Sequence, residues 1–385
     1  MSRWQHPQQQ EISLAQVIET NHQSLVAGES RLSFRKNFKA LWAVGASLSV
    51  VLTVCAPGQT KPLPQGSLIA QAPKKEVEIT LVSFAVTKTA HDRVIPKFVE
   101  KWKKEHNQTV TFKQSYGGSG SQARAVIDGL DADIVHLALA PDIKKIEKAG
   151  LIQPGWEKEL PNNSIVSKSV AGIVTREGNP KGIKGFADLA KNGVSFITAD
   201  PKSSGGARWN FLALWGSVIQ EGGNEAKAKD FITKAYKNVP VLPKDAREAS
   251  DVFFKQGQGD ALINYENEII LAGQKGEKLP YIIPEVNISI DNPIAVVDKN
   301  VDKHGSREVS EAFVKYLFSP EAQREFAQVG FRPVDRTVAK EYGSKFPKLK
   351  TLATAQDFGG WDLIQKKFFA DGGVFDQVQA TIAKR

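Results

Sequence analysis

Three short stretches rich in small residues could bind an anion. They are VSFAVTKT (82–89), SYGGSGSQA (115–123) and KSSGGARW (202–209). Each joins a predicted strand to a predicted helix, where unpaired backbone N–H groups and a partial positive charge attract negative ligands. Glycine lets the backbone approach a small ligand, and serine adds a hydroxyl donor. Taken singly, each stretch is also consistent with a turn that caps a helix, but together they predict a small oxyanion held by several loops.

Enzymatic motifs fit the same stretches less well. A nucleotide-binding loop reads G-x-x-x-x-G-K-[ST], whereas Lys202 precedes the glycines. A hydrolase nucleophile elbow reads G-x-S-x-G, but residues 117–121 lack its last glycine and residues 203–205 lack its first. Neither motif is therefore complete.

An exported serine hydrolase is nevertheless the alternative from a different functional class. Its nucleophile would be Ser119 or Ser204, and its base would be His91 or His136. No sequence feature pairs either histidine with a serine, and histidines on such helices and strands are usually structural. We therefore expect a binding protein without catalytic activity.

The elements that would position these stretches alternate between strands and helices. We predict strands at 77–84, 109–115, 133–139, 194–198, 239–242 and 260–265, and helices at 91–106, 142–149, 207–220, 224–237, 246–256 and 319–330, with a short helix after 117–120. This rhythm is typical of parallel sheets covered by helices, which bind ligands at the carboxyl ends of their strands. Long extended runs at 164–176 and 286–299 predict hinge strands between two α/β lobes.

Composition excludes several other classes. The net charge is +9, but acids interleave with the bases, as in FVEKWKKEHN (98–107), so we expect a charged surface and no nucleic-acid binding. Cys55 is the only cysteine, which rules out an intramolecular disulfide and a thiolate zinc site. The six histidines show no ligand spacing. We expect neither a metal nor a cofactor.

A leader precedes the folded region and predicts export to the periplasm. The basic stretch RKNFK (35–39) is followed by the uncharged run 40–54, which is shorter than the ~20 residues that span a bilayer. A short membrane anchor or a buried helix is the alternative. Residues 1–34 exceed a normal leader, so we expect translation to start downstream of Met1.

Two routes of leader processing are open. Residues 52–55, Leu-Thr-Val-Cys, resemble a lipobox that would lipidate Cys55, although valine replaces the usual small residue before the cysteine. Cleavage after Ala72, in an A-x-A pattern, is the other route.

Length and element pattern together predict four parts. These are a leader (1–72), a first part of lobe 1 (75–165), lobe 2 (166–292), and a second part of lobe 1 with the C-terminal helices (293–385).

Several longer motifs resemble the periplasmic sulfate-binding proteins of ABC importers. They are PKSSGGARWN (201–210), YENE (265–268), SKFPKLK (344–350), FGGW (358–361) and the SYGGSG loop, and the resemblance runs from about residue 77 to residue 385. It implies the type II periplasmic-binding-protein fold, in which two α/β lobes joined by hinge strands close on sulfate. It also implies a monomer that delivers its ligand to a permease and ATPase complex. Thiosulfate, molybdate and phosphate are the alternative ligands.

The resemblance also implies seven uncharged donors around sulfate. They are the amides of Ala85, Gly205, Gly206 and Ala246, the hydroxyls of Ser119 and Ser204, and the side chain of Tyr265. Relatives usually carry an acidic residue at the position of Ala85, but only its backbone matters. They usually carry a tryptophan at the position of Tyr265. A tyrosine hydroxyl can accept as well as donate, which predicts a weaker or broader sulfate site that tolerates thiosulfate.

Discrimination against phosphate is expected from a cavity made only of donors, because phosphate near neutral pH carries a proton that needs an acceptor. Asp245 and Glu266 adjoin two donor positions, and a carboxylate turned inward would weaken this discrimination. Lys202 and Arg208 flank the central loop, and we expect them to have surface or structural roles.

Overall fold

The computed structural model describes residues 75–384. The predicted leader, with Cys55 and both processing sites, lies outside the described residues. Within 75–384, no helix is long and apolar enough to cross a membrane. The same residues contain no group of three or more histidine, cysteine, aspartate or glutamate side chains placed to hold a metal ion.

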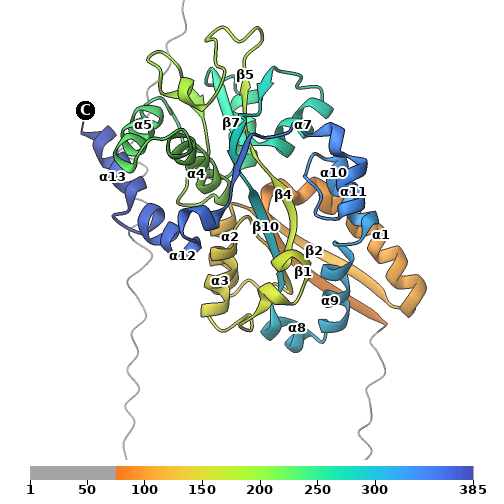
Figure 1. The fold of residues 1–385 in the computed structure, drawn as a ribbon. Helices are drawn as coiled ribbons and strands as arrows, with labels where there is room; N and C mark the ends of the chain where they lie inside the picture. The colour runs from red at the N-terminus through yellow and green to blue at the C-terminus, as the bar shows by residue number, and fades with distance from the viewer. Residues whose placement is uncertain (1–74, 385) are drawn as a thin grey trace, which may run out of the picture. The chain divides into compact units, whose positions relative to one another are not determined.

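The first sheet has five strands in the order β2-β1-β3-β10-β4 (Figure 1). Its elements are β1 (Glu76–Phe84), α1 (Lys88–His106), β2 (Thr109–Gly117), α2 (Ser119–Ile127), β3 (Ile134–His136), α3 (Ala140–Lys148), β4 (Ile165–Ser169) and β10 (Ile290–Val296). β1 pairs in parallel with β2 and β3, as the βαβαβ rhythm predicts. β10 runs antiparallel to both β3 and β4, so the prediction of a parallel sheet is wrong for the returning strands.

The second sheet has four strands in the order β6-β7-β5-β8. Its elements are β5 (Ala171–Thr175), β6 (Phe196–Ile197), α4 (Gly205–Gln220), α5 (Glu225–Lys237), α6 (Ala246–Phe254), β7 (Ala261–Tyr265), α7 (Glu266–Gln274) and β8 (Tyr281–Ile282). β7 is parallel to β6 and antiparallel to β5.

The predicted strand at 239–242 does not form. The chain there runs close to β6, since the amide of Phe196 donates to Asn238 O and the amide of Asp200 donates to Pro243 O. Pro240 and Pro243 have no N–H group, so the segment cannot complete a strand ladder. A run of apolar residues was therefore not sufficient evidence for a strand.

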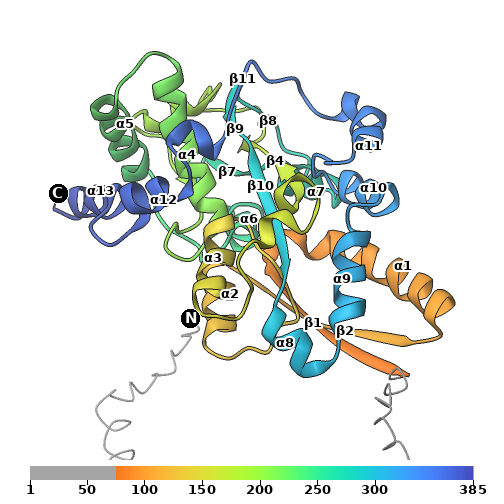
Figure 2. The ribbon, with the colours of Figure 1, turned by 60° about the horizontal axis from the view of Figure 1, so that its bottom comes forward.

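Each of the two predicted hinge runs divides between two sheets (Figure 2). Run 164–176 divides into β4, in the five-stranded sheet, and β5, in the four-stranded sheet. Run 286–299 divides into β9 (Val286–Ile288), which forms a separate two-stranded sheet with β11 (Thr351–Ala353), and β10, in the five-stranded sheet. The long extended pattern was thus correct, and the sheet changes partway along it.

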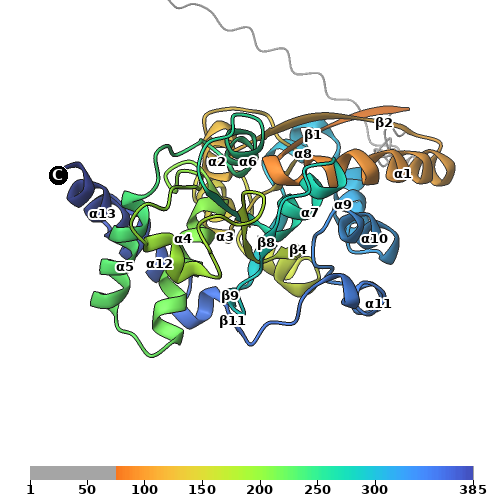
Figure 3. The ribbon, with the colours of Figure 1, turned by 90° about the horizontal axis from the view of Figure 1, so that it is seen from above.

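The C-terminal region contributes α8 (Asp298–His304), α9 (Arg307–Tyr316), α10 (Pro320–Gln328), α11 (Arg336–Glu341), α12 (Trp361–Ile364) and α13 (Val374–Ala383). α10 packs on α1, whereas α13 packs on α5 (Figure 3). The predicted start of α10 is confirmed, because Ser319 Oγ accepts the amide of Ala322. The largest buried apolar cluster includes residues of both sheets, and part of it surrounds the site described next.

Candidate functional site

A small cavity lies where β1, β2 and β7 end and where α2, α4 and α6 begin. All seven predicted donor residues line it, namely Ala85, Ser119, Ser204, Gly205, Gly206, Ala246 and Tyr265. The cavity is small, with a volume of about 10 Å³. The sequence interpretation missed Ala138, which also lines the cavity. Ala138 follows β3, and the position of that strand in the βαβαβ unit was the signal that could have identified it.

The start of α4 supplies three adjacent donors. Ser204 is the N-cap, and its Oγ accepts the amide of Ala207 at 3.3 Å, which leaves the hydroxyl hydrogen for another partner. Gly205 and Gly206 occupy the first two helical positions, whose N–H groups have no carbonyl to bond within the helix. A Cβ atom on Gly206 would lie 2.5 Å from Cε2 of Tyr265. Glycine is therefore required for the close approach of α4 to Tyr265.

The start of α6 exposes one amide in a similar way. The carboxylate of Asp245 caps this helix by accepting the amides of Arg247 at 3.0 Å and Glu248 at 2.9 Å. The cap leaves the amide of Ala246, at the first helical position, available to a ligand. Ala85 opens a short 3-10 helix (Ala85–Thr87) between β1 and α1.

The two carboxylates that could accept a proton from the ligand both have other hydrogen-bond partners. Asp245 lines the cavity, and its Oδ1 accepts two amides of its own helix. Glu266 forms a paired hydrogen bond with Arg332, at 2.6 and 3.0 Å. Burial raises the pKa of Glu266, and Arg332 partly offsets this effect. The cavity therefore remains dominated by donors.

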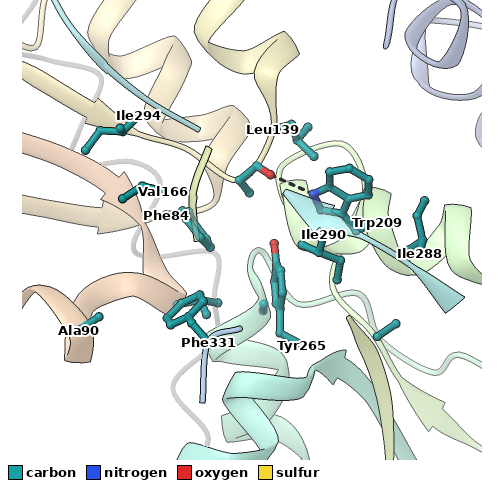
Figure 4. Close-up of a cluster of buried hydrophobic side chains, with 14 of the residues drawn as sticks. Phe84, Ala90, Leu139, Val166, Trp209, Tyr265, Ile288, Ile290, Ile294 and Phe331 are labelled. Atoms are coloured by element: carbon teal, nitrogen blue, oxygen red, sulfur yellow. Dashed lines mark hydrogen bonds between the residues drawn. The ribbon is translucent and has the colours of Figure 1, made fainter. Parts of the chain in front are cut away.

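Tyr265 carries a buried hydroxyl that lacks a partner. Its side chain is fully buried, and its Oη has no hydrogen bond within the described part of the chain. Figure 4 shows this hydroxyl pointing toward the side of the cluster where Leu139 and Trp209 lie. Burial raises the pKa of Tyr265 well above its usual value, so the hydroxyl keeps its proton. An unpaired buried hydroxyl costs about 1–3 kcal/mol, and because Tyr265 lines the cavity, its Oη is a candidate donor to a ligand bound there.

The hydroxyl of Ser119 is already used in this structure, contrary to its expected orientation. Its Oγ donates to Asp142 Oδ2 at 2.7 Å and accepts the amide of Ala138 at 3.0 Å. A serine hydroxyl has one hydrogen, so it cannot also donate to a ligand. The amide of Ser119, at the first position of α2, remains available. No local pattern predicts this bond, because Asp142 belongs to the next helix, α3.

Asp142 is a buried anion that its neighbours neutralise. Its Oδ1 accepts from Arg208 Nη1 at 3.2 Å and from Lys145 Nζ at 2.9 Å. Burial disfavours the charged form, but Arg208 and Lys145 together hold the pKa of Asp142 below its usual value. Arg208 thus has the structural role that we expected. Lys202 also has one, because its Nζ lies 2.6 Å from Asp376 Oδ1.

No lysine, arginine or histidine is among the residues that line the cavity. The positive potential there comes from backbone N–H groups at the starts of α2, α4 and α6. Such an arrangement can hold a small anion by dipoles without a direct ion pair.

The arrangement needed for serine hydrolysis is missing from the described residues. His91 Nε2 lies 3.0 Å from His136 Nδ1, and His91 Nδ1 lies 3.0 Å from Tyr116 Oη. Both histidines are buried, and burial lowers the pKa of His91 to about 3. Neither forms a hydrogen bond with Ser119 or Ser204 within 75–384.

Comparisons with known proteins identify the family of this chain. Residues 79–332 match the family model described as bacterial extracellular solute-binding protein. A sulfate-binding protein from Synechococcus elongatus is 56% identical over 91% of this chain and 98% of its own length. A thiosulfate-binding protein from Pseudomonas aeruginosa is 40% identical over 77% of this chain and 90% of its own length.

A solved structure gives the same result for the fold. The sulfate-binding protein SubI from Mycobacterium tuberculosis superposes with a TM-score of 0.71 at 37% identity, covering 76% of this chain and 99% of SubI. The predicted type II periplasmic-binding-protein fold and the resemblance to sulfate-binding proteins of ABC importers are therefore confirmed. The chain belongs to the bacterial extracellular solute-binding proteins.

Proposed function

We propose that this chain binds sulfate outside the cytoplasmic membrane and delivers it to the permease and ATPase complex of an ABC importer. The observation that carries the proposal is the convergence of the seven expected donors on one small cavity, with the Tyr265 hydroxyl unpartnered. Its relatives with sulfate-binding and thiosulfate-binding names support the same ligand class.

Dipoles would balance the charge of the dianion. The amides of Ala85, Gly205, Gly206 and Ala246 donate from the backbone, and the Ser204 and Tyr265 hydroxyls donate from side chains. Spread over several donors, the charge is stabilised without a buried cation that would slow release.

Ser119 would contribute in one of two ways. Its amide can donate to the ligand directly, since it lies at the first position of α2. Its hydroxyl can donate only by releasing Asp142, which would keep Arg208 and Lys145 as partners.

Tyr265 favours thiosulfate as a second ligand of the same site. The resemblance to sulfate-binding proteins implies an indole at this position, whereas a hydroxyl oxygen can accept as well as donate. We therefore expect a cavity less strict than a donor-only one, with sulfate bound more tightly than phosphate.

The remaining expectations follow from this function. The protein would be exported by its leader, act as a monomer without catalysis, and close two lobes with boundaries near residues 165 and 292. Its hinges would be the segments that cross between sheets, β4 to β5 and β9 to β10.

Isothermal titration of the mature chain, starting near residue 75, tests the proposal. Sulfate, thiosulfate, molybdate and phosphate are titrated in turn, and we expect heat with sulfate first. Absence of heat with sulfate refutes the proposed function. Turnover of ester substrates, or labelling by a fluorophosphonate, would instead support the hydrolase.

A further inference from the structure

Ala138 connects elements of both sheets at the edge of the cavity. Its amide donates to Ser119 Oγ at 3.0 Å, on α2. Its carbonyl accepts from Trp209 Nε1 at 2.9 Å, on α4, and a dashed line marks this bond in Figure 4. Trp209 is 1% exposed and is not among the residues that line the cavity. An indole of the second sheet's helix thus reaches the end of a strand of the first sheet.

Two further bonds tie the start of α4 to the first sheet's helices. Arg208 Nη1 contacts Asp142 Oδ1 on α3 at 3.2 Å. The amide of Gly120, on α2, donates to Ser203 O at 3.1 Å. These contacts lie beside the donors of α2 and α4, so they hold the two donor sets against one cavity.

Among these contacts, Trp209 contributes a buried indole N–H that donates to the carbonyl of Ala138. A buried indole N–H needs an acceptor, and here that acceptor is a carbonyl beyond the cavity. The ring of Trp209 also packs edge-on against Trp361, at 4.7 Å between ring centres. The ring is therefore held both by this packing and by the bond from its N–H to Ala138 O.

We propose that Trp209 is a positioning residue that slows release of the bound anion by holding the start of α4 against the end of β3. This inference rests on the proposed function, because it concerns the same ligand. The bond joins α4, beside the second sheet, to the end of β3, in the first sheet, so it must break if these elements separate to release the anion. Its loss should speed opening and leave entry unchanged.

Trp215 provides a matched control on the same helix. It is also buried, and its ring packs against Phe368 at 4.9 Å, but the described residues show no hydrogen bond from its indole to the first sheet. Trp215→Phe therefore makes the same chemical change in the same helix without touching the contact between the sheets.

The experiment measures the rate at which the protein releases radiolabelled sulfate. Excess unlabelled sulfate starts the release, and rapid filtration follows the label that stays bound. Titration calorimetry gives the dissociation constant. Trp209→Phe should raise the release rate about 3- to 10-fold, which is the change expected from losing one neutral hydrogen bond. The association rate should stay within about 2-fold of that of the unchanged chain. Trp215→Phe should leave both rates unchanged. A second variant replaces the Trp209 indole with its benzothiophene isostere, which keeps the shape but lacks the N–H, so it separates the bond from any folding defect.

Each outcome has a separate meaning. A release rate for both Trp209 variants equal to that of Trp215→Phe would overturn the role of Trp209. A change confined to the association rate would overturn it as well. Absence of sulfate binding by the unchanged chain would instead refute the proposed function.

Discussion

Removing the hydroxyl of Tyr265 should weaken ligand binding and stabilise the empty protein. Tyr265→Phe keeps the buried ring and its packing on Gly206, and it deletes one oxygen that has no partner among the described residues. If this oxygen donates to bound sulfate, its loss removes a hydrogen bond to a charged group. In the empty protein, its loss removes an unpaired polar group from the core.

The two magnitudes can be estimated separately. A hydrogen bond to a charged group contributes about 1.5–3 kcal/mol, so the dissociation constant for sulfate should rise about 10- to 100-fold. An unpaired buried hydroxyl costs about 1–3 kcal/mol, so the free energy of unfolding without sulfate should increase by about 1 kcal/mol or more. Titration calorimetry measures the first quantity, and urea unfolding in sulfate-free buffer measures the second.

Tyr236→Phe is the control for this pair of measurements. Tyr236, on α5, is also buried with an unpartnered hydroxyl, but it is not among the residues that line the cavity. We expect it to stabilise the empty protein and leave sulfate affinity unchanged. Unchanged affinity in Tyr265→Phe would exclude its hydroxyl from the ligand shell, and lower stability in the empty state would show that the hydroxyl has another partner.

Three further predictions concern the loops and the core. Ser204→Ala should raise the sulfate dissociation constant about 10-fold. Lys202→Ala breaks a surface ion pair with α13 and should change the dissociation constant little. A larger effect of Lys202→Ala in titrations would contradict binding by uncharged donors. Gly206→Ala should abolish measurable sulfate binding, because its methyl group would lie 2.5 Å from the Tyr265 ring, and retained affinity would show that the ring can move. Acid should destabilise the protein through the buried histidine pair. The pKa of His91 is about 3 in the folded protein and about 6.5 in the unfolded chain. The stability that the neutral imidazole contributes is therefore present above pH 6.5 and is lost as the pH falls toward 3. Urea unfolding should show a loss of about 2 kcal/mol from this residue between about pH 7 and about pH 5, and a double His-to-Gln variant with the same slope as the unchanged chain would refute this assignment.

The order of elements could be predicted from local pattern. The helix expected at 207–220 begins two residues earlier, at Gly205, because Ser204 caps it. The strand expected at 239–242 fails because apolar side chains cannot replace the N–H groups that its prolines lack. Patterns of apolar residues predict burial, but they do not predict whether backbone N–H and C=O groups form hydrogen bonds.

The residues of the site were predictable, but their hydrogen bonds were not. Loop composition and family resemblance identified the seven positions that meet at the cavity. The bond from Ser119 to Asp142, and that from Trp209 to Ala138, join residues 23 and 71 positions apart. Only the packing of helices on their sheets brings these partners together.

The starts of α2, α4 and α6 face one cavity, and each carries a partial positive charge of about half a unit. Like charges repel, so these three helix ends oppose their own convergence whenever no anion lies between them. Contacts such as the Trp209 indole bond work against this repulsion, and the balance sets how often an empty molecule adopts the loaded shape. A transporter that recognises the anion-bound conformation would then distinguish anion-bound from empty protein, because the bound anion cancels this repulsion.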